Sequence, residues 1–225
     1  GSLSYINPNL LKMYEEADAQ LFVRGNNDPL QFSDIDPKRV LEQRKSRSAI
    51  SRIIFRNHDD GRSRWCLSQI PTHAQARGAG MSLSEYTEFI MAACGLNEGI
   101  DPVRYWGKIS ESQENIIQKL ELFKEYHVVG EKTDLYFSTE GRKWINSCGT
   151  TNFPSGEIFT SPVEESINGC IYFDYPLIFS GKEIKEINLF VKDGKIFDAT
   201  AEKNETFLYN ILDTDKGSRF FGEFA

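Results

Sequence analysis

The change from helix-like to strand-like patterning near residue 126 constrains the fold of this chain more than any other feature. From about Tyr126 onward the sequence consists of short runs typical of β-strands, separated by turn residues. Asp193-Gly194 separates the last two runs by two residues, and Asp-Gly favours a type I′ hairpin turn. This half is therefore predicted to be a mainly antiparallel sheet. The predicted strands are residues 127–129, 134–138, 169–175, 186–192 and 195–201, and a helix is predicted for residues 204–212.

Helix signals dominate the part of the chain that precedes this sheet. Asn7-Pro8 and Asp36-Pro37 each place a capping residue before a proline, which is typical of a helix N-terminus. The first helix is expected to reach about Ala19 and to be followed by a strand at Gln20 to Val23, with another strand at residues 64–67. We expect residues 1–60 to be the C-terminal remnant of an α/β domain, because one strand cannot form a sheet.

Two further helices are predicted in the part of the chain between residue 61 and the sheet. Ser84 is the expected cap of a helix that runs to Cys94. Ser110-x-x-Gln113 has the form of a capping box, and an apolar stripe on one face of the helix is predicted to be core. The stripe consists of Ile116, Leu120 and Phe123. The fold class is therefore α+β, with residues 61–225 expected to be the first part of a second domain that is incomplete at its C-terminus.

Composition indicates which classes of partner the protein can have and in which cellular compartment it is expected. Net charge is −7, which argues against nucleic acid or an anionic membrane as the main partner, because both require excess Lys and Arg. The basic helix near residues 38–56 is accordingly interpreted as a solvated face. No apolar run reaches the roughly 18 to 20 residues that span a bilayer. The four cysteines are far apart, which favours reduced thiols and a cytoplasmic location.

Two glutamates stand in apolar, glycine-containing segments. Glu157 lies within residues 152–162, which read Asn-Phe-Pro-Ser-Gly-Glu-Ile-Phe-Thr-Ser-Pro, and Glu223 ends residues 215–223, which read Asp-Lys-Gly-Ser-Arg-Phe-Phe-Gly-Glu. An ionised carboxylate in such surroundings needs a compensating cation, and a metal ion is the natural candidate. A solvent-facing strand residue is the alternative for each glutamate taken alone.

Together these segments resemble the thermophilic-type cocatalytic metallo-aminopeptidases, the family of aminopeptidases T, S and II. Residues 152–162 are similar to the family pattern Asn-x-Pro-(Thr/Ser)-x-Glu-(Val/Ile)-Phe-Thr-x-Pro, and the two glutamates stand 66 positions apart, as the family's do. The resemblance extends from about Trp65 to the last residue. Further matches are Thr133-Asp134-Leu135, Trp144, Ala201-Glu202 and residues 215–223.

The resemblance implies a two-metal peptidase in which Glu157 and Glu223 are metal ligands. The metals would be two divalent ions (zinc, cobalt, manganese or magnesium), the substrate a peptide, and the assembly a cytoplasmic homodimer. The family's remaining ligands, histidines and an aspartate, lie further along the chain than Glu223. None of the three histidines here, His58, His73 and His127, has a ligand spacing. We therefore expect this piece to lack turnover, and a catalytically silent peptide-binding or dimerising relative remains the alternative.

Overall fold

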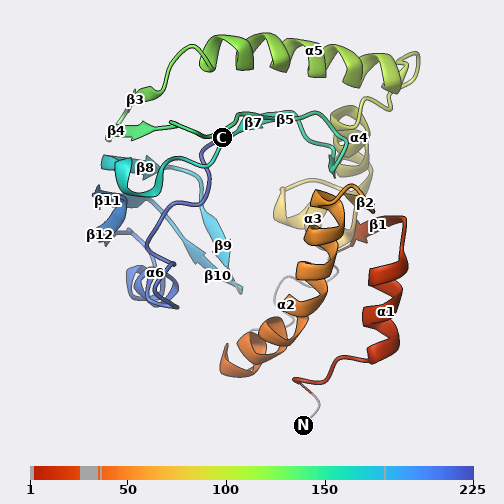
Figure 1. Cartoon of the computed structure of the whole chain (residues 1–225), viewed down its shortest axis with the longest axis horizontal. Helices are drawn as coiled ribbons and strands as arrows, with labels where there is room; N and C mark the ends of the chain where they lie inside the picture. Colours follow the sequence, from red (N-terminus) through yellow and green to blue (C-terminus); the bar gives the residue numbers. More distant parts are fainter. Residues whose placement is uncertain (1–2, 26–34, 36, 180) are drawn as a thin grey trace. The chain divides into compact units, whose positions relative to one another are not determined.

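The structure, a computed structural model, describes residues 3–25, 35, 37–179 and 181–225 (Figure 1). The chain divides into two compact units, which consist of residues 1–106 with 148–155 and residues 107–147 with 156–225. The boundary between these units does not coincide with the domain boundary expected after residue 60. The strand at residues 64–69 pairs with the strand at residues 19–24, so both belong to the first unit. Each unit is described by itself.

The first unit is built on a three-stranded parallel sheet. Its strands lie in the order β1-β2-β6, and helix α2 connects β1 to β2 along the chain. The predicted strands at residues 20–23 and 64–67 are thereby confirmed. The elements of this unit are α1 (Pro8–Glu16), β1 (Ala19–Arg24), α2 (Pro37–Asp59), β2 (Arg64–Gln69), α3 (His73–Gly78), α4 (Leu83–Ala93) and β6 (Asn152–Phe153).

The first two helices begin where the sequence predicts. The Asn7 side chain accepts a hydrogen bond from the Asn9 backbone N–H at 3.0 Å, and α1 starts at Pro8. It ends at Glu16 rather than near Ala19, because Ala19 already belongs to β1. Helix α2 starts at Pro37. Asp36, its expected cap, lies outside the described residues.

The prediction that Ser84 caps α4 is wrong, because Ser82 performs that role. The Ser82 hydroxyl accepts from the Glu85 backbone N–H at 3.2 Å, and the Glu85 carboxylate accepts from the Ser82 N–H at 2.8 Å. This reciprocal box requires a Glu three residues after the cap, which only Ser82 has. The hydrogen bond from the Ser82 backbone N–H, and after it one from the Ser82 side chain, lowers the pKa of the Glu85 carboxyl. The carboxylate half of the box therefore acts above the ordinary pKa of Glu and is lost as pH falls through the lowered value.

The prediction of a capping box at Ser110 is also wrong. Helix α5 runs from Pro102 to Leu120, and Asp101 caps it by accepting from the backbone N–H of Val103 at 3.0 Å and of Arg104 at 3.3 Å. Ser110 therefore lies in the middle of the helix.

The apolar stripe predicted for this helix is not its buried face, and of its three residues only Leu120 is half-buried. Ile116 and Phe123 are 45% and 63% exposed, whereas Gln113 and Ile117 are the buried positions of the helix. Phe123 lies beyond the last helical residue, so it no longer shares a helical face with Ile116.

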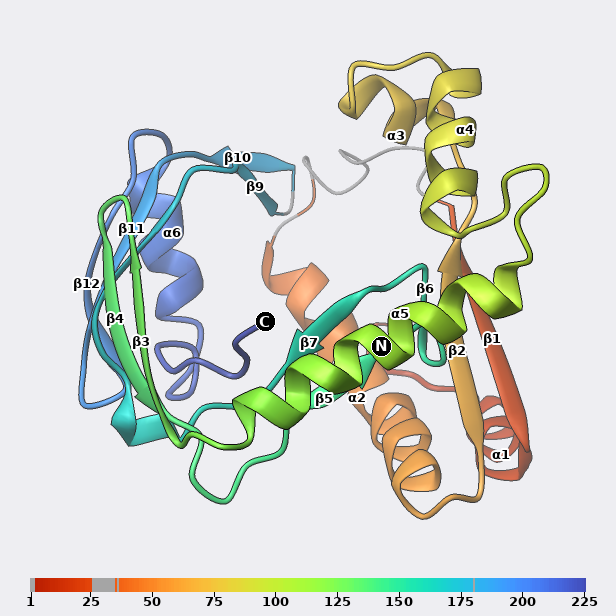
Figure 2. The same ribbon diagram turned by 90° about the horizontal axis from the view of Figure 1, so that it is seen from above.

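The second unit contains a five-stranded antiparallel sheet, as predicted for this half. Its strands lie in the order β12-β11-β8-β4-β3, and Figure 2 shows α6 along one face of them. Leu208 and Leu212 of α6 join Leu135 and Phe137 of β4 in the core cluster. Besides residues 107–120 of α5, the elements are β3 (Glu125–Gly130), β4 (Thr133–Ser138), β5 (Ile145–Ser147), β7 (Glu157–Phe159), η1 (Glu164–Ser166), β8 (Asn168–Phe173), β9 (Leu177–Phe179), β10 (Lys182–Ile184), β11 (Ile187–Lys192), β12 (Lys195–Thr200) and α6 (Glu205–Leu212).

The hairpin between β11 and β12 confirms the Asp-Gly prediction. Asp193 and Gly194 both have positive φ, at 50° and 76°, as a type I′ turn requires. Gly194 also packs against another segment: a Cβ there would lie 1.7 Å from the Glu164 carbonyl oxygen. The short strands β5, β7, β9 and β10 have three residues each and were not predicted, since runs of that length carry no clear alternation.

None of the helices in the described ranges is long and apolar enough to cross a membrane.

The capping assignment can be tested with two matched serine substitutions. Ser82→Ala is expected to lower the free energy of unfolding by about 1 kcal/mol, because it leaves the first turn of α4 without its cap. Ser84→Ala is expected to change it by less than about 0.5 kcal/mol, because Ser84 is exposed within the helix. Urea denaturation followed by far-ultraviolet circular dichroism measures both. A larger loss for Ser84→Ala would contradict the assignment.

Candidate metal-binding residues

The segment at residues 152–162 contributes to both units. Asn152 and Phe153 form β6 of the parallel sheet, whereas Glu157 begins β7 of the second unit. Gly156 lies between them with a φ of 116°, a backbone conformation that residues other than glycine rarely adopt. Its N–H donates to the Ser147 carbonyl at 3.0 Å, which fixes the chain directly before Glu157.

Strand β5 sets the direction of the Glu157 side chain. β7 pairs antiparallel with β5, so that Glu157 lies opposite Ser147 and Ile158 lies opposite Asn146. The Asn146 side-chain amide donates to the Ser110 carbonyl of α5 at 2.9 Å, so that face of the pair is turned toward α5. Because side chains alternate along a strand, Glu157 projects from the opposite face.

Thr160 joins the two glutamate segments. It forms an antiparallel bridge with Phe224, in which each backbone N–H donates to the other residue's carbonyl at 2.9 Å. Thr160 is fully buried, and its hydroxyl donates to the Lys143 carbonyl at 2.9 Å. The Phe224 ring lies 4.6 Å from that of Phe137 in the core. The tertiary structure therefore brings together segments that are far apart in sequence.

This pairing places Glu157 and Glu223 on the same side of the strand pair. Thr160 and Phe224 face the core, and each glutamate is an odd number of residues from its bridge residue, so both project away from the core. Both glutamates are exposed. They are four strand positions apart, which is roughly 13 Å along the strands at about 3.3 Å per residue. The carboxylates share a side without touching.

The segment that precedes Glu223 is held by Arg219. The Arg219 guanidinium forms an ion pair with Asp213 at 2.7 Å and donates to the Ile196 carbonyl at 2.9 Å. The Ile196 N–H donates back to the Arg219 carbonyl at 2.9 Å. Arg219 therefore fastens the second glutamate segment to β12 through the Ile196 backbone and to the end of α6 through Asp213. Its guanidinium also lies 5.8 Å from the centre of the Tyr209 ring.

The two glutamates offer the type of ligand atom that divalent cations prefer, but too few of them to complete a coordination shell. Carboxylate oxygens suit zinc, manganese and magnesium, yet a complete shell needs four to six donors. Within the described ranges, no group of three or more His, Cys, Asp or Glu side chains is placed to hold a metal ion. Glu157 and Glu223 can therefore supply only part of a coordination shell.

The three histidines have packing or surface roles, as expected. His127 contacts Asp134 at 2.8 Å and stacks on Tyr136 with ring centres 3.8 Å apart. His58 lies edge-on to Trp65 at 6.0 Å. His73 is the exposed first residue of α3. The Trp144 indole, another match to the family pattern, donates to the Tyr126 hydroxyl at 3.2 Å and packs against its ring.

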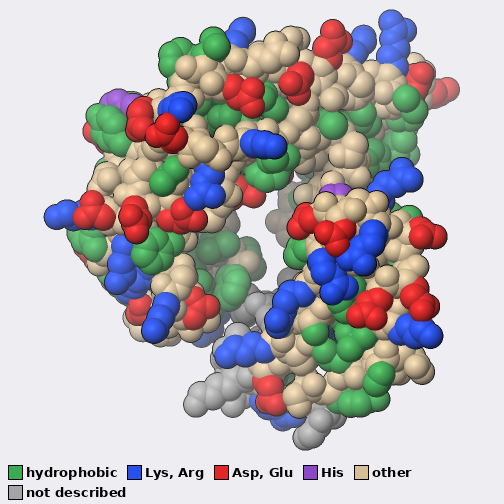
Figure 3. Space-filling model, in the orientation of Figure 1, with side chains coloured by type: hydrophobic (Ala, Val, Ile, Leu, Met, Phe, Trp, Pro, Cys, Tyr) green, Lys and Arg blue, Asp and Glu red, His purple; other side chains and the backbone are tan. Residues whose placement is uncertain are grey.

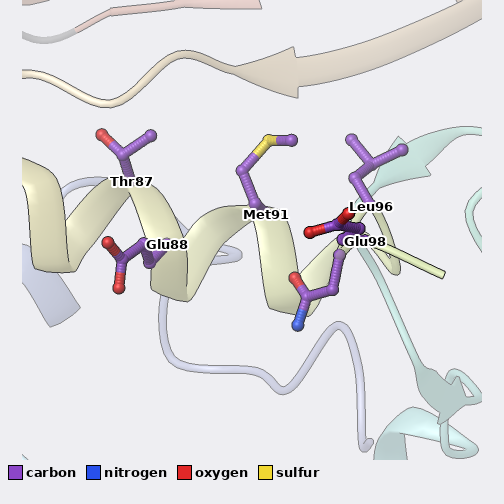
Figure 4. Close-up of a pocket in the computed structure, with 6 residues that line it drawn as sticks. Thr87, Glu88, Met91, Leu96 and Glu98 are labelled. Atoms are coloured by element: carbon purple, nitrogen blue, oxygen red, sulfur yellow. The ribbon is translucent and has the colours of Figure 1, made fainter. Parts of the chain in front are cut away.

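Other surface features do not involve the glutamate segments. A shallow cavity of about 300 Å³ lies at the C-terminal end of α4, and Figure 4 shows Met91 and Leu96 among its lining residues. Figure 3 shows Lys and Arg side chains gathered over α2. Arg39, Lys45 and Arg52 are among the exposed basic residues of that helix.

Comparisons with known proteins agree with the resemblance. Residues 2–225 match the sequence profile of the family described as "Thermophilic metalloprotease (M29)". The chain is 27% identical to Aminopeptidase 2 of Geobacillus stearothermophilus over 95% of its own length, and 26% identical to Aminopeptidase T of Thermus aquaticus over 99%. It is 32% identical to Aminopeptidase AmpS of Bacillus subtilis, over 61% of its own length and 36% of that relative.

The fold has a solved counterpart. The structure described as wild-type AmpT from Thermus thermophilus superposes with a TM-score of 0.80 at 23% identity, and the match covers 99% of this chain and 59% of that one. The mixed α+β fold is shared. The chain belongs to the thermophilic metalloprotease (M29) family. It spans 55% of the length of Aminopeptidase 2 and 58% of that of Aminopeptidase T.

Sequence patterns identified Glu157 and Glu223 but missed the residues that position them. In the sequence Thr160 is only one residue of the first glutamate segment, and nothing marks Asn146. The family pattern Thr-x-Pro was the available signal for Thr160. A single Asn in a three-residue strand carries no such signal.

The stabilising role of the Thr160 hydroxyl, which bonds the Lys143 carbonyl, can be tested by removing it. Thr160→Val keeps the shape but leaves the Lys143 carbonyl without its buried donor, and should lower the free energy of unfolding by about 1 to 3 kcal/mol. Thr160→Ser retains the hydroxyl and should preserve more of the stability. Urea denaturation of the three proteins gives the comparison. Equal stability of the Val and wild-type chains would rule out the role.

Proposed function

We propose that this chain is part of a metal-dependent aminopeptidase, which hydrolyses N-terminal residues from peptides, and that Glu157 and Glu223 are two of its metal ligands. The observation that carries the proposal is the Thr160–Phe224 bridge, which places both glutamates on one side of one strand pair. Family membership and the names of the aminopeptidase relatives support the reaction class.

The proposed cofactor is a pair of divalent ions, either zinc, cobalt, manganese or magnesium. When bound, two such ions activate a water molecule and polarise the scissile carbonyl. Glu157 would supply its carboxylate from the start of β7, and Glu223 would supply its own from the segment bridged to β7. Both side chains are exposed, so neither carboxylate needs to leave an ion pair within the described part of the chain before it binds a cation.

This chain's own residues would hold the two carboxylates in place. Gly156 allows the backbone turn into β7, and Thr160 fixes the register between β7 and the last residues. Arg219 fastens the second segment to β12 through the Ile196 carbonyl and to the end of α6 through Asp213. Thr160 and Phe224 face the core, so the opposite side of the strand pair, which carries the glutamates, is left for the cation and the peptide.

The partner and compartment predictions accompany this function. We propose a peptide substrate, a homodimer and a cytoplasmic location, without nucleic acid or a membrane as partner. All four cysteines are free thiols, which is compatible with a reducing compartment. Cys94 is buried, and burial raises the pKa of its thiol, which keeps it protonated and unreactive.

We further propose that the 225 residues alone do not turn over substrate, because two carboxylates do not complete a two-metal site. The gene sequence downstream of codon 225 is the most direct check. Histidines and an aspartate within the next ~100 codons, a distance set by ordinary domain size, would support the enzyme. A stop codon there would favour the silent peptide-binding or dimerising relative.

Metal binding by the two glutamates can be measured without any activity. Mn²⁺ added to the ¹⁵N-labelled chain should broaden the amide signals near residues 157 and 223 first, with weak affinity of about millimolar order. Glu157→Gln and Glu223→Gln should each remove the broadening at their own segment. Glu165→Gln is the control, because Glu165 is exposed and lies in η1. Equal broadening around every exposed carboxylate would contradict the assignment.

The hydrolysis assay tests the expected lack of turnover. The chain, incubated with Leu-p-nitroanilide and each candidate metal in turn, should release no p-nitroaniline above the rate of a Glu157→Gln, Glu223→Gln double variant. Metal-dependent release that the double variant lacks would show that the two glutamates suffice, and would overturn this part of the proposal.

A further inference from the structure

Trp144 is connected to the segment that carries Glu157. It directly follows Lys143 in the chain, and the Lys143 carbonyl accepts the hydrogen bond from the buried Thr160 hydroxyl at 2.9 Å. Thr160 in turn lies three residues after Glu157. A displacement of Trp144 would therefore move the carbonyl group that holds the first glutamate segment.

The Tyr126 hydroxyl fixes the position of the Trp144 indole. The indole N–H donates to this hydroxyl at 3.2 Å, and the two rings pack edge to face with their centres 5.5 Å apart. The hydroxyl itself donates to the Leu120 carbonyl, at the end of α5, at 2.6 Å. A phenol has one proton to donate, so Tyr126 gives that proton to Leu120 and accepts from Trp144. The hydroxyl thereby fastens Trp144 to the last turn of α5.

The Tyr126 ring extends the connection to the last residues of the chain. It stacks on Phe137 of β4 with ring centres 5.2 Å apart and ring planes at 14°. The Phe137 ring is buried in the core of the second unit and lies 4.6 Å from the ring of Phe224. Phe224 directly follows Glu223. The ring of Tyr126 therefore supports the second glutamate segment, whereas its hydroxyl supports the first.

These contacts form a closed network around the backbone bridge between the two segments. Each member contacts or directly adjoins the next, and all of them belong to the second unit. Closely packed interiors transmit a displacement from one contact to the next. Neither glutamate segment can therefore shift without disturbing the other. The network consists, in order, of Thr160, Lys143, Trp144, Tyr126, Phe137 and Phe224, and the bridge from Phe224 back to Thr160 closes it.

We propose that Tyr126 is a positioning residue for the two candidate ligands, and that it holds the Glu157 and Glu223 segments in a fixed relation through its hydroxyl and its ring. This inference rests on the proposed function and adds to it a residue that acts through its neighbours. Ligand side chains bind a cation well only when packing holds them to within about 0.5 Å of the required geometry. Loss of the hydroxyl should therefore loosen both segments and weaken cation binding at both.

Hydrogen exchange measured by NMR tests the connection without any metal. Tyr126→Phe removes the hydroxyl and keeps the ring on Phe137. The amides of Thr160 and Phe224, which donate to each other's carbonyls, should then exchange about tenfold faster than in the wild type. Trp144→Phe removes the donor of the same hydrogen bond and should give the same pattern. Amides of the β11–β12 hairpin, which lies outside the network, should keep their exchange rates.

A Mn²⁺ titration of the same ¹⁵N-labelled variants tests whether the positioning serves the cation. In Tyr126→Phe, the Mn²⁺ concentration that half-broadens the signals near residues 157 and 223 should rise about threefold or more at both segments. Tyr136→Phe is the matched control, because Tyr136 is a 50% exposed tyrosine of the same strand as Phe137 and lies outside the network. It should change neither the exchange rates nor the Mn²⁺ concentration.

The outcomes separate this inference from the proposed function. Unchanged exchange of the Thr160 and Phe224 amides in Tyr126→Phe would overturn the positioning role. Faster exchange with an unchanged Mn²⁺ concentration would overturn it as well, because the hydroxyl would then stabilise the core without serving the ligands. In both cases selective broadening in the wild type would leave Glu157 and Glu223 as ligands. A wild-type chain without selective broadening would instead overturn the proposed function and, with it, this inference.

Discussion

The backbone exchange between Thr160 and Phe224 is the interaction on which the candidate site depends. It joins a strand in the middle of the chain to its last residues, and the buried Thr160 hydroxyl ties that strand to the Lys143 carbonyl as well. The core packing of the Phe224 ring against Phe137 turns one side of the pair inward. Because strands alternate their side chains, the two glutamates are turned outward by the same contacts. Core packing on the inner face of this strand pair thus determines that the two carboxylates lie on its outer face.

The second unit supplies a rigid support for this pair. Its five-stranded sheet buries Leu135 and Phe137 against α6, and the β11–β12 hairpin closes on a glycine that no larger residue could replace. Arg219 connects the final segment to β12 through a hydrogen bond to the Ile196 carbonyl, and to the end of α6 through an ion pair with Asp213. The order of these elements along the chain explains why the two glutamate segments stand 66 positions apart and yet meet: the intervening residues form three of the five strands and the helix that covers them.

Sequence patterns predicted the strands well and the helix boundaries less well, for physical reasons. Alternation over five or six residues and the Asp-Gly turn are local signals, and both were confirmed in the sheet. The predictions of caps at Ser84 and Ser110 failed because several nearby serines have a hydroxyl that can cap a helix. Only the position of the first helical turn determines which residue is the cap. Ser82 has Glu85 three residues later, and Asp101 stands before Pro102. The prediction that Ile116 and Phe123 belong to the core failed for a related reason, because the extent and the buried face of the helix are known only from the structure.

The sequence by itself determined the family, the α+β class and the hairpin, and it singled out the two glutamates as candidate ligands, because each depends on residues that are close together or follow a fixed pattern. Only the tertiary structure decided that Thr160 pairs with Phe224 and that Asn146 turns its face toward α5. These contacts join residues distant in sequence, and they depend on which backbone groups and which side-chain faces remain after the cores have formed. A local sequence pattern does not show which groups these will be.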